Sequence, residues 1–268
     1  MHVYVPRSRD KFPAVKQTTK VNDDYADQLR KLCGNQLMET KNQQNLSAES
    51  VAELIQRRAT WKVLGDVANP VLISPEVATL NDPKVVAAIK AAGWAPFHYD
   101  RAVDGIAEPW RAHVLWNHEC RTVANKFFEW FEDVKPNNKL PAMLSACGAL
   151  VLVTWLPQFR GRLVADDLVV PNEKQIQIDE EHLAATAAMV QNLLLVLTAE
   201  GMGTYWSSGG QFQTVEMFER LGIPSSERLL AAVFVEYPET MSAPNERLAG
   251  KQRANRAVDA RWLSEVGL

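Results

Sequence analysis

One long apolar segment, "DEEHLAATAAMVQNLLLVLTAEGMG" (179–203), constrains the fold most strongly. Acidic residues stand at its start, glycines stand at its end, and apolar residues almost encircle it, which predicts a helix. A helix that is apolar on all sides must be covered by other elements, so we expect it at the centre of the domain. Small residues follow it in "SSGG" (207–210). They indicate either an ordinary turn or a turn that lies against a flat ligand.

Overall charge and length narrow the class of protein. The chain has 268 residues, a formal charge of −3 and a sequence pI of about 6.0. This length suits one large domain or two small ones. Because no positive excess is present, we expect no nucleic-acid partner and no anionic membrane surface as a partner.

The cysteines and the apolar runs argue against several other classes. Cys33, Cys120 and Cys147 are far apart and form no CxxC pair, so we expect buried reduced thiols and no metal site. The longest apolar runs, such as "GALVLVTWL" (148–156), are shorter than the roughly 18 residues that span a bilayer. The N-terminus lacks the apolar core of a secretory signal, so we expect a cytoplasmic protein with no membrane partner.

Patterning divides the chain into a polar N-terminal extension, residues 1–46, and a compact domain, residues 47–268. Helices are predicted over 45–58, 82–93 and 117–134, with Asp82 as N-cap and Pro83 as the first helical residue of the second. Strands are predicted over 110–116, 148–156 and 229–238, and the tail from Met241 is expected to be irregular. This mixed order differs from the strict alternation of a doubly wound sheet.

Two basic clusters are candidates for phosphate binding. Arg57 and Arg58 end the first predicted helix, and the C-terminal segment "KQRANR" contains Lys251 and Arg253. Arginine suits bidentate phosphate contact, although a solvated surface is the plainer alternative for each cluster. No G-x-G-x-x-G follows a strand and no Walker motif is present, so no known nucleotide loop accompanies them.

A long loop, "APFHYDRAVDGIAEPW" (95–110), separates a predicted helix from a predicted strand. Long loops in compact domains are often functional. His98 in this loop could act as a base or a ligand, although a lone histidine is more often an ordinary hydrogen-bonding residue.

Several short motifs in a fixed order resemble the nitroreductase-like family of flavin mononucleotide (FMN) enzymes. They are "EPW" (108–110), "QN" (191–192) with "GMGTYW" (201–206), and "LGIP" (221–224) with "VEYP" (235–238). The resemblance covers the chain from Ser47 to Arg256. It implies an α+β fold with a central, mostly antiparallel sheet flanked by helices. It also implies an intertwined homodimer with FMN at the subunit interface.

The resemblance assigns both basic clusters to the FMN phosphate. Arg57, Arg58 and Ala59 of "RRATW" match the family's first phosphate motif, and Lys251 and Arg253 match its basic pair in the tail.

The resemblance also places two segments beside the isoalloxazine ring. They are a loop containing Pro96, Phe97 and His98, and a turn of the other subunit containing Ser207, Ser208, Gly209 and Gly210.

Two positions depart from the family pattern. Ala59 stands where the family has serine, and Trp61 stands where a basic residue is common. That cation favours the negative charge that develops on flavin reduction, so its loss makes reduction harder unless Lys62 or Arg101 replaces it. The loop before "EPW" is also longer than is usual, so the resemblance does not carry nitroarene specificity over to this chain.

The resemblance implies an FMN-dependent oxidoreductase that transfers hydride from NAD(P)H to an electron-poor organic acceptor, a nitroaromatic or a quinone, in a ping-pong cycle. No residue is assigned as catalytic, and the candidates for a proton donor are His98, Tyr99 and Arg101. The alternatives are a reductive dehalogenase, a dehydrogenase of a small natural product, and a flavin-binding protein without turnover.

Overall fold

The computed structural model describes residues 47–159, 163–164, 167–168, 171–256, 260 and 262–266. Contacts divide the chain into Met1–Ala48 and Glu49–Leu268, and the description below concerns the second unit. The predicted extension, residues 1–46, lies outside the described residues, so its boundary stays a prediction.

A four-stranded antiparallel sheet forms the centre of this unit, which confirms the predicted fold class. Its strand order is β2 (Trp110–Trp116), β3 (Ala149–Trp155), β7 (Arg228–Glu236) and β6 (Gly203–Ser207). The first three strands confirm the predicted ones within two residues at each end. Strand β6 was not predicted; it forms because Thr204, Tyr205 and Trp206 have high β-propensity and pair with β7.

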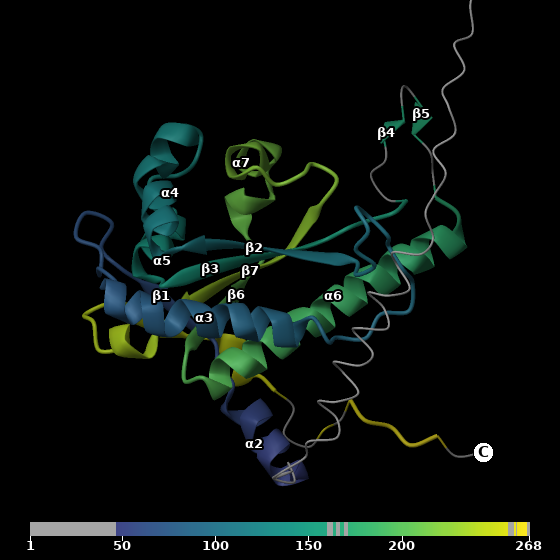
Figure 1. Ribbon diagram of the computed structural model, residues 1–268, viewed down its shortest axis with the longest axis horizontal. Coiled ribbons are helices and arrows are strands. Elements are labelled where there is room, and N and C mark those ends of the chain that lie inside the picture. Colours follow the sequence, from purple (N-terminus) through teal and green to yellow (C-terminus); the bar gives the residue numbers. More distant parts are fainter. Residues whose placement is uncertain are drawn as a thin grey trace, which may run out of the picture. The chain divides into compact units, whose positions relative to one another are not determined.

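Helices cover both faces of the sheet. Figure 1 shows α3 (Pro75–Ala92) and α6 (Glu173–Ala199) on one face and α4 (Asn117–Trp130) and α7 (Val215–Leu221) on the other, with α5 (Leu140–Ala146) beside α4. Alternate residues of β3 therefore enter different cores: Val151 and Val153 pack towards α6, and Leu150 and Leu152 pack towards α4. A strand buried on both faces reads as the continuous apolar run seen in the sequence.

Helix α6 is central as predicted, but it begins six residues before the predicted start. Asn172 accepts a hydrogen bond from the backbone of Gln175 and Gln175 accepts one from Asn172, a complete capping box. Asp179 therefore lies within the helix and is buried, and its carboxylate accepts a hydrogen bond from the backbone of Gln158. Among the described residues, α6 alone is long and apolar enough to cross a membrane, a test that core helices also meet.

Helix α3 also begins earlier than predicted. Ser74 is its N-cap, so Asp82 is not a cap and Pro83 lies inside the helix. The carboxylate of Asp82 instead accepts a hydrogen bond of 2.5 Å from the buried hydroxyl of Tyr237. Burial of α3 offsets the roughly 3 kcal/mol cost of an internal proline, since several of its apolar side chains are fully covered.

A two-stranded antiparallel ribbon pairs a segment near the start of the domain with a segment near its end. It pairs β1 (Trp61–Leu64), which follows α2 (Ala48–Arg57), with β8 (Glu246–Ala249). The tail was predicted to be irregular, which was wrong: β8 is followed by a short 3-10 helix, η3 (Lys251–Arg253). The sequence only weakly indicates β8, because a polar strand of four residues has no alternation of apolar and polar residues.

The remaining elements are short. They are the hairpin β4 (Leu163–Val164) and β5 (Asp167–Leu168), and the 3-10 helices η1 (Gly210–Gln213) and η2 (Pro238–Thr240). Cys120 and Cys147 are free and buried, as expected, and burial raises the pKa of the Cys120 thiol. Cys33 lies outside the described residues.

Candidate functional site

The ribbon of β1 and β8 brings the two basic clusters of the sequence together. In its register Trp61 lies opposite Ala249, and the backbone of Gly250 donates to the carbonyl of Thr60. The residues that follow α2 are therefore held beside those that follow β8. About 190 residues of sequence separate the clusters, but one strand pairing joins them.

A cavity of about 700 Å³ lies at this junction, and we call it the cationic cavity. Its lining residues are Arg58, Ala59, Thr60, Trp61, Lys62, Tyr205, Leu248, Ala249, Gly250, Lys251, Gln252 and Arg256. Within the part of the chain that the structure describes, four lining residues carry a positive charge and none carries a negative one. A concave surface of one sign concentrates the field, so the cavity suits an anion such as a phosphate monoester.

Lys62 is the partly buried lysine of this cavity. Burial lowers the pKa of its ammonium group, and the nearby charge of Lys139 lowers it further. The ammonium lies 5.5 Å from the centre of the Tyr205 ring, a cation–π contact that favours the charged form. The Arg58 guanidinium is held differently, since it donates to the Thr60 hydroxyl at 3.3 Å.

A second cavity of about 410 Å³ adjoins the first and shares Arg58 and Thr60 with it. Its other lining residues are Gln191, Leu194, Trp206, Ser208 and Leu230. Gln191 belongs to the "QN" pair on α6, and Trp206 and Ser208 lie on or just after β6. Together the two cavities form a surface with cations at one end and an aromatic ring and small residues at the other.

The turn after β6 depends on glycine. Gly209 has a φ of 105°, and a Cβ there would lie 2.3 Å from the Leu229 side chain. Gly210 has a φ of 57°, and no atom lies within 4 Å of an added Cβ. Packing against Leu229 therefore requires glycine at position 209, whereas the space beside Gly210 is open.

Five of the predicted binding residues line these cavities. They are Arg58, Ala59, Trp61, Ser208 and Lys251. Ser207, Gly209 and Gly210 belong to the same turn as Ser208. Arg57 is exposed at the end of α2 and lines neither cavity, and the side chain of Arg253 lies outside the described residues.

The predicted loop beside the ring lies elsewhere in this chain. Pro96, Phe97 and His98 line neither cavity; Phe97 packs edge-on against Trp110, with 5.6 Å between ring centres. Arg101, a proposed substitute for the missing cation, donates to the carbonyls of Leu156 and Pro157. That leaves Lys62 as the substitute that lines the cationic cavity.

Sequence reasoning missed Thr60, Tyr205 and Gln252 as lining residues. Thr60 bridges to Thr204 of β6, which brings Tyr205 to the cavity. The signal was the β-rich run "TWKVL", which could have been read as a strand directly after the basic pair. Among the described residues no group of three or more His, Cys, Asp or Glu side chains could hold a metal ion.

Comparison with known proteins gives one consistent family. The family model described as "Nitroreductase family" matches residues 80–235. The Bacillus subtilis protein YfhC, which carries the name NAD(P)H nitroreductase, is 25% identical over 167 residues, which are 62% of this chain and 78% of that protein.

Two solved structures share the fold. A nitroreductase-like family protein from Bacillus cereus superposes with a TM-score of 0.51 at 19% identity, over 79% of this chain and 97% of that one. The nitroreductase CinD from Lactococcus lactis, solved with chloramphenicol, superposes with a TM-score of 0.50 at 14% identity, over 78% of this chain and 98% of that one.

Proposed function

This chain belongs to the nitroreductase family, and on that premise we propose that it is an FMN-dependent oxidoreductase supplied with hydride by NADH or NADPH. The observation that carries the proposal is the cationic cavity, in which Arg58 and Lys251 line one space from opposite ends of the chain. The acceptor is an electron-poor organic molecule such as a nitroaromatic or a quinone.

The donor chemistry of the cavity fits the phosphate of FMN. Guanidinium and ammonium groups bind phosphate oxygens strongly, and among the described residues four of them and no carboxylate line the cavity. Ala59 contributes no hydroxyl where the family has serine, but the Thr60 hydroxyl lies in the same cavity. We assign the phosphate to the part of the cavity between Arg58 and Lys251.

The adjoining cavity fits a flat ring. Trp206 and Ser208 supply one wall. Gly210 lies further along the same turn, where it leaves the backbone accessible because it has no side chain. Pro96, Phe97 and His98 lie outside this wall. We therefore propose the reverse of the arrangement that the resemblance implies: the turn after β6 contacts the ring of its own chain, and these three residues reach the ring of the partner subunit in a homodimer. This assignment also gives a role to the exposed face of His98.

When bound, FMN supplies the hydride chemistry, and the protein supplies position and charge. The family commonly has a basic residue where this chain has Trp61. Lys62, which lines the cationic cavity, would take over its role and stabilise the negative charge that develops when the flavin is reduced. NAD(P)H and the organic acceptor use the same face of the site in turn. Because the hydride chemistry belongs to FMN, no protein nucleophile is required. We assign proton donation to the loop that holds His98, Tyr99 and Arg101. We also propose that the protein is cytoplasmic.

The test is to extract the chromophore from purified full-length protein, identify it by mass, and repeat with Arg58→Ala/Lys251→Ala. We expect FMN in the wild type and colourless, folded protein in the double variant. Arg220→Ala on α7, which removes an exposed cation paired with Glu216 at 2.7 Å, is the matched control and should retain the flavin. A double variant that keeps stoichiometric FMN would contradict the phosphate assignment.

A flavin-binding protein without NAD(P)H turnover is the second candidate, favoured by Ala59 and Trp61 at two family positions. Anaerobic addition of NADH or NADPH to the yellow protein separates the two. Bleaching of the flavin colour supports the reductase, whereas persistent colour with either nucleotide supports the binding protein or an enzyme that uses another reductant.

A further inference from the structure

The ribbon that carries the cations is joined to the main sheet at only a few described points. Its strands pair with each other, and among the described residues one isolated bridge, between Thr60 and Thr204, links it to β6. Just after the other end of β1, the backbone of Gly65 donates to the carbonyl of Ala142 on α5. Backbone pairing alone therefore leaves the β8 side of the ribbon without a connection to the sheet.

A partly buried ion pair makes that connection. Glu236 at the end of β7 is 5% exposed, and its carboxylate accepts a hydrogen bond from the guanidinium of Arg247 on β8. The same guanidinium donates to the carbonyls of Ala243 at 3.0 Å and Thr240 at 3.4 Å. Arg247 therefore joins the sheet, the η2 turn and the ribbon through one planar group.

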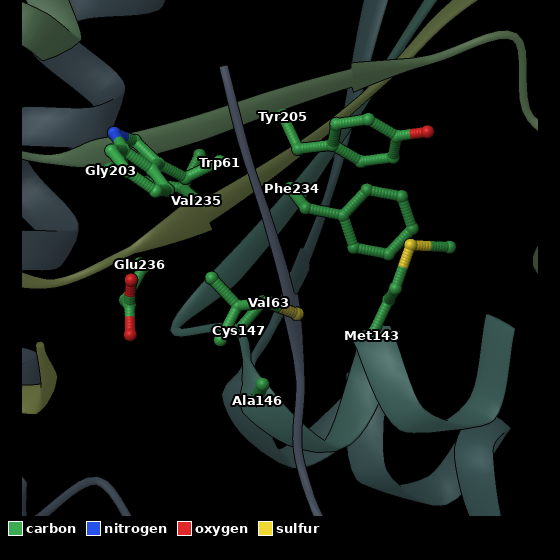
Figure 2. Close-up of a pocket in the computed structure, with 10 residues that line it drawn as sticks. All are labelled: Trp61, Val63, Met143, Ala146, Cys147, Gly203, Tyr205, Phe234, Val235 and Glu236. Carbon is green, nitrogen blue, oxygen red and sulfur yellow. The ribbon is translucent and has the colours of Figure 1, made fainter. Parts of the chain in front are cut away.

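Local sequence makes room for this pair. Gly203 lies opposite Glu236 in the pairing of β6 and β7, and a Cβ at Gly203 would lie 3.2 Å from Oε2 of Glu236. Glu236 and Trp61 both line a small cavity of about 10 Å³, where Figure 2 shows the carboxylate on the opposite side from Met143 and Phe234. Trp61 also lines the cationic cavity, so the two cavities share a wall.

The ends of the ribbon are the parts that matter for binding. Arg247 lies opposite Val63 in the ribbon and four residues before Lys251. A shift of β8 along or away from the sheet would therefore move Lys251 relative to Arg58. Phosphate binding by two groups from different strands requires their separation to be held, since small displacements weaken charged hydrogen bonds strongly.

We infer that Glu236 and Arg247 are positioning residues that hold the ribbon in place and so set the affinity of the cationic cavity for the phosphate of FMN. The inference rests on the proposed flavin function. Neither side chain lines the cationic cavity, so each acts through Arg58 and Lys251.

The experiment compares the dissociation constants of FMN and riboflavin, which lacks the phosphate, for flavin-stripped full-length protein. Glu236→Gln keeps the size of the side chain and removes its charge. We expect it to weaken FMN binding about tenfold and riboflavin binding less than about twofold. Loss of general packing would instead weaken both ligands equally, and that result, like no change in either, would overturn the inference.

Arg247→Met and the double variant provide an independent check. Because the two residues act as a unit, the double variant should lose about tenfold in FMN affinity, as each single variant does, whereas independent effects would multiply to about a hundredfold. The double variant also leaves no unpaired buried charge, so it remains testable if Glu236→Gln fails to fold. A hundredfold loss would overturn the inference.

Glu216→Gln is the matched control, because it removes a carboxylate from the exposed pair with Arg220 on α7. It should leave both dissociation constants unchanged. The wild type distinguishes the proposed phosphate site from the positioning role of Glu236. If it binds FMN no better than riboflavin, the proposed phosphate site fails; if it prefers FMN and Glu236→Gln retains the full preference, only the positioning role fails.

Discussion

Glu227 is a buried carboxylate with partners on two strands. It is 5% exposed, His113 of β2 hydrogen-bonds it at 2.7 Å, and the Thr154 hydroxyl of β3 donates to it. Burial acts to raise the pKa of Glu227, but hydrogen bonds from His113 and Thr154 and the charges of His113 and Arg111 outweigh it and lower the pKa. Because the pKa is lower in the folded protein, this carboxylate stabilises the fold above its ordinary pKa of 4.5 and less as the pH falls.

Glu227→Gln should lower the free energy of unfolding by about 1–3 kcal/mol at neutral pH, because a buried charged hydrogen-bond acceptor is lost. The difference from wild type should shrink below about pH 4.5, where the wild type loses the same contribution. Denaturant unfolding at several pH values measures this, with the exposed Glu216→Gln as control. A difference that stays constant from neutral to acid pH would contradict the role of the ionised carboxylate.

Gly148 is required by its neighbour and not by its backbone conformation. A Cβ there would lie 2.8 Å from three ring atoms of Tyr237, and that ring is fully buried and held by its hydrogen bond to Asp82. Gly148→Ala should therefore lower the free energy of unfolding by about 1–3 kcal/mol, the usual cost of overpacking.

Gly93→Ala is the comparison for Gly148→Ala. Its φ of −62° suits alanine, and the nearest atom lies 3.3 Å from an added Cβ, so its effect should be smaller. Thermal unfolding of both variants measures the difference, and an equal effect would show that contact with the Tyr237 ring is not the cause.

At the scale of elements, helix starts were predicted less well than strands. Helices α3 and α6 both begin earlier than predicted, because Ser74 and Asn172 cap them upstream of the predicted starts. Helix α4 ends at Trp130, four residues before its predicted end. Glu132 and Asp133 follow, and acidic residues at a helix C-terminus oppose its dipole.

Asn172→Ala should lower the free energy of unfolding by about 1 kcal/mol, because it removes the oxygen that accepts from the backbone of Gln175. Asn172→Asp keeps an oxygen in the same position and should have little effect. Chemical denaturation of the two variants measures this. Equal destabilisation by both would mean that the capping box does not stabilise α6.

At the scale of the whole molecule, the local charge at the site opposes the net charge. The chain carries −3 overall, while the cationic cavity is lined by four positive side chains. Ionic strength should therefore act on a phosphorylated ligand and not on a neutral one.

Raising sodium chloride from about 20 mM to about 500 mM should weaken FMN binding about tenfold and change riboflavin binding less than about twofold. Flavin fluorescence during titration of the stripped protein measures both constants. An FMN constant that is independent of salt would place the phosphate outside the cationic cavity.

Sequence alone determined the layers and the family of this protein. The apolar runs of β3 and α6 have only one stable position, under cover on both sides, and the ordered motifs from "EPW" to "VEYP" point to one fold. Both basic clusters could also be named as phosphate candidates, because arginine and lysine carry their chemistry in the side chain itself.

Tertiary structure decided which of those cations share a space. Arg58 lines the cavity and Arg57 does not, and Lys62 rather than Arg101 lies beside the Trp61 position. These choices depend on the pairing of β1 with β8, which joins residues at opposite ends of the domain. Such long-range pairing leaves no local period in a polar four-residue strand, so only the folded chain could show it.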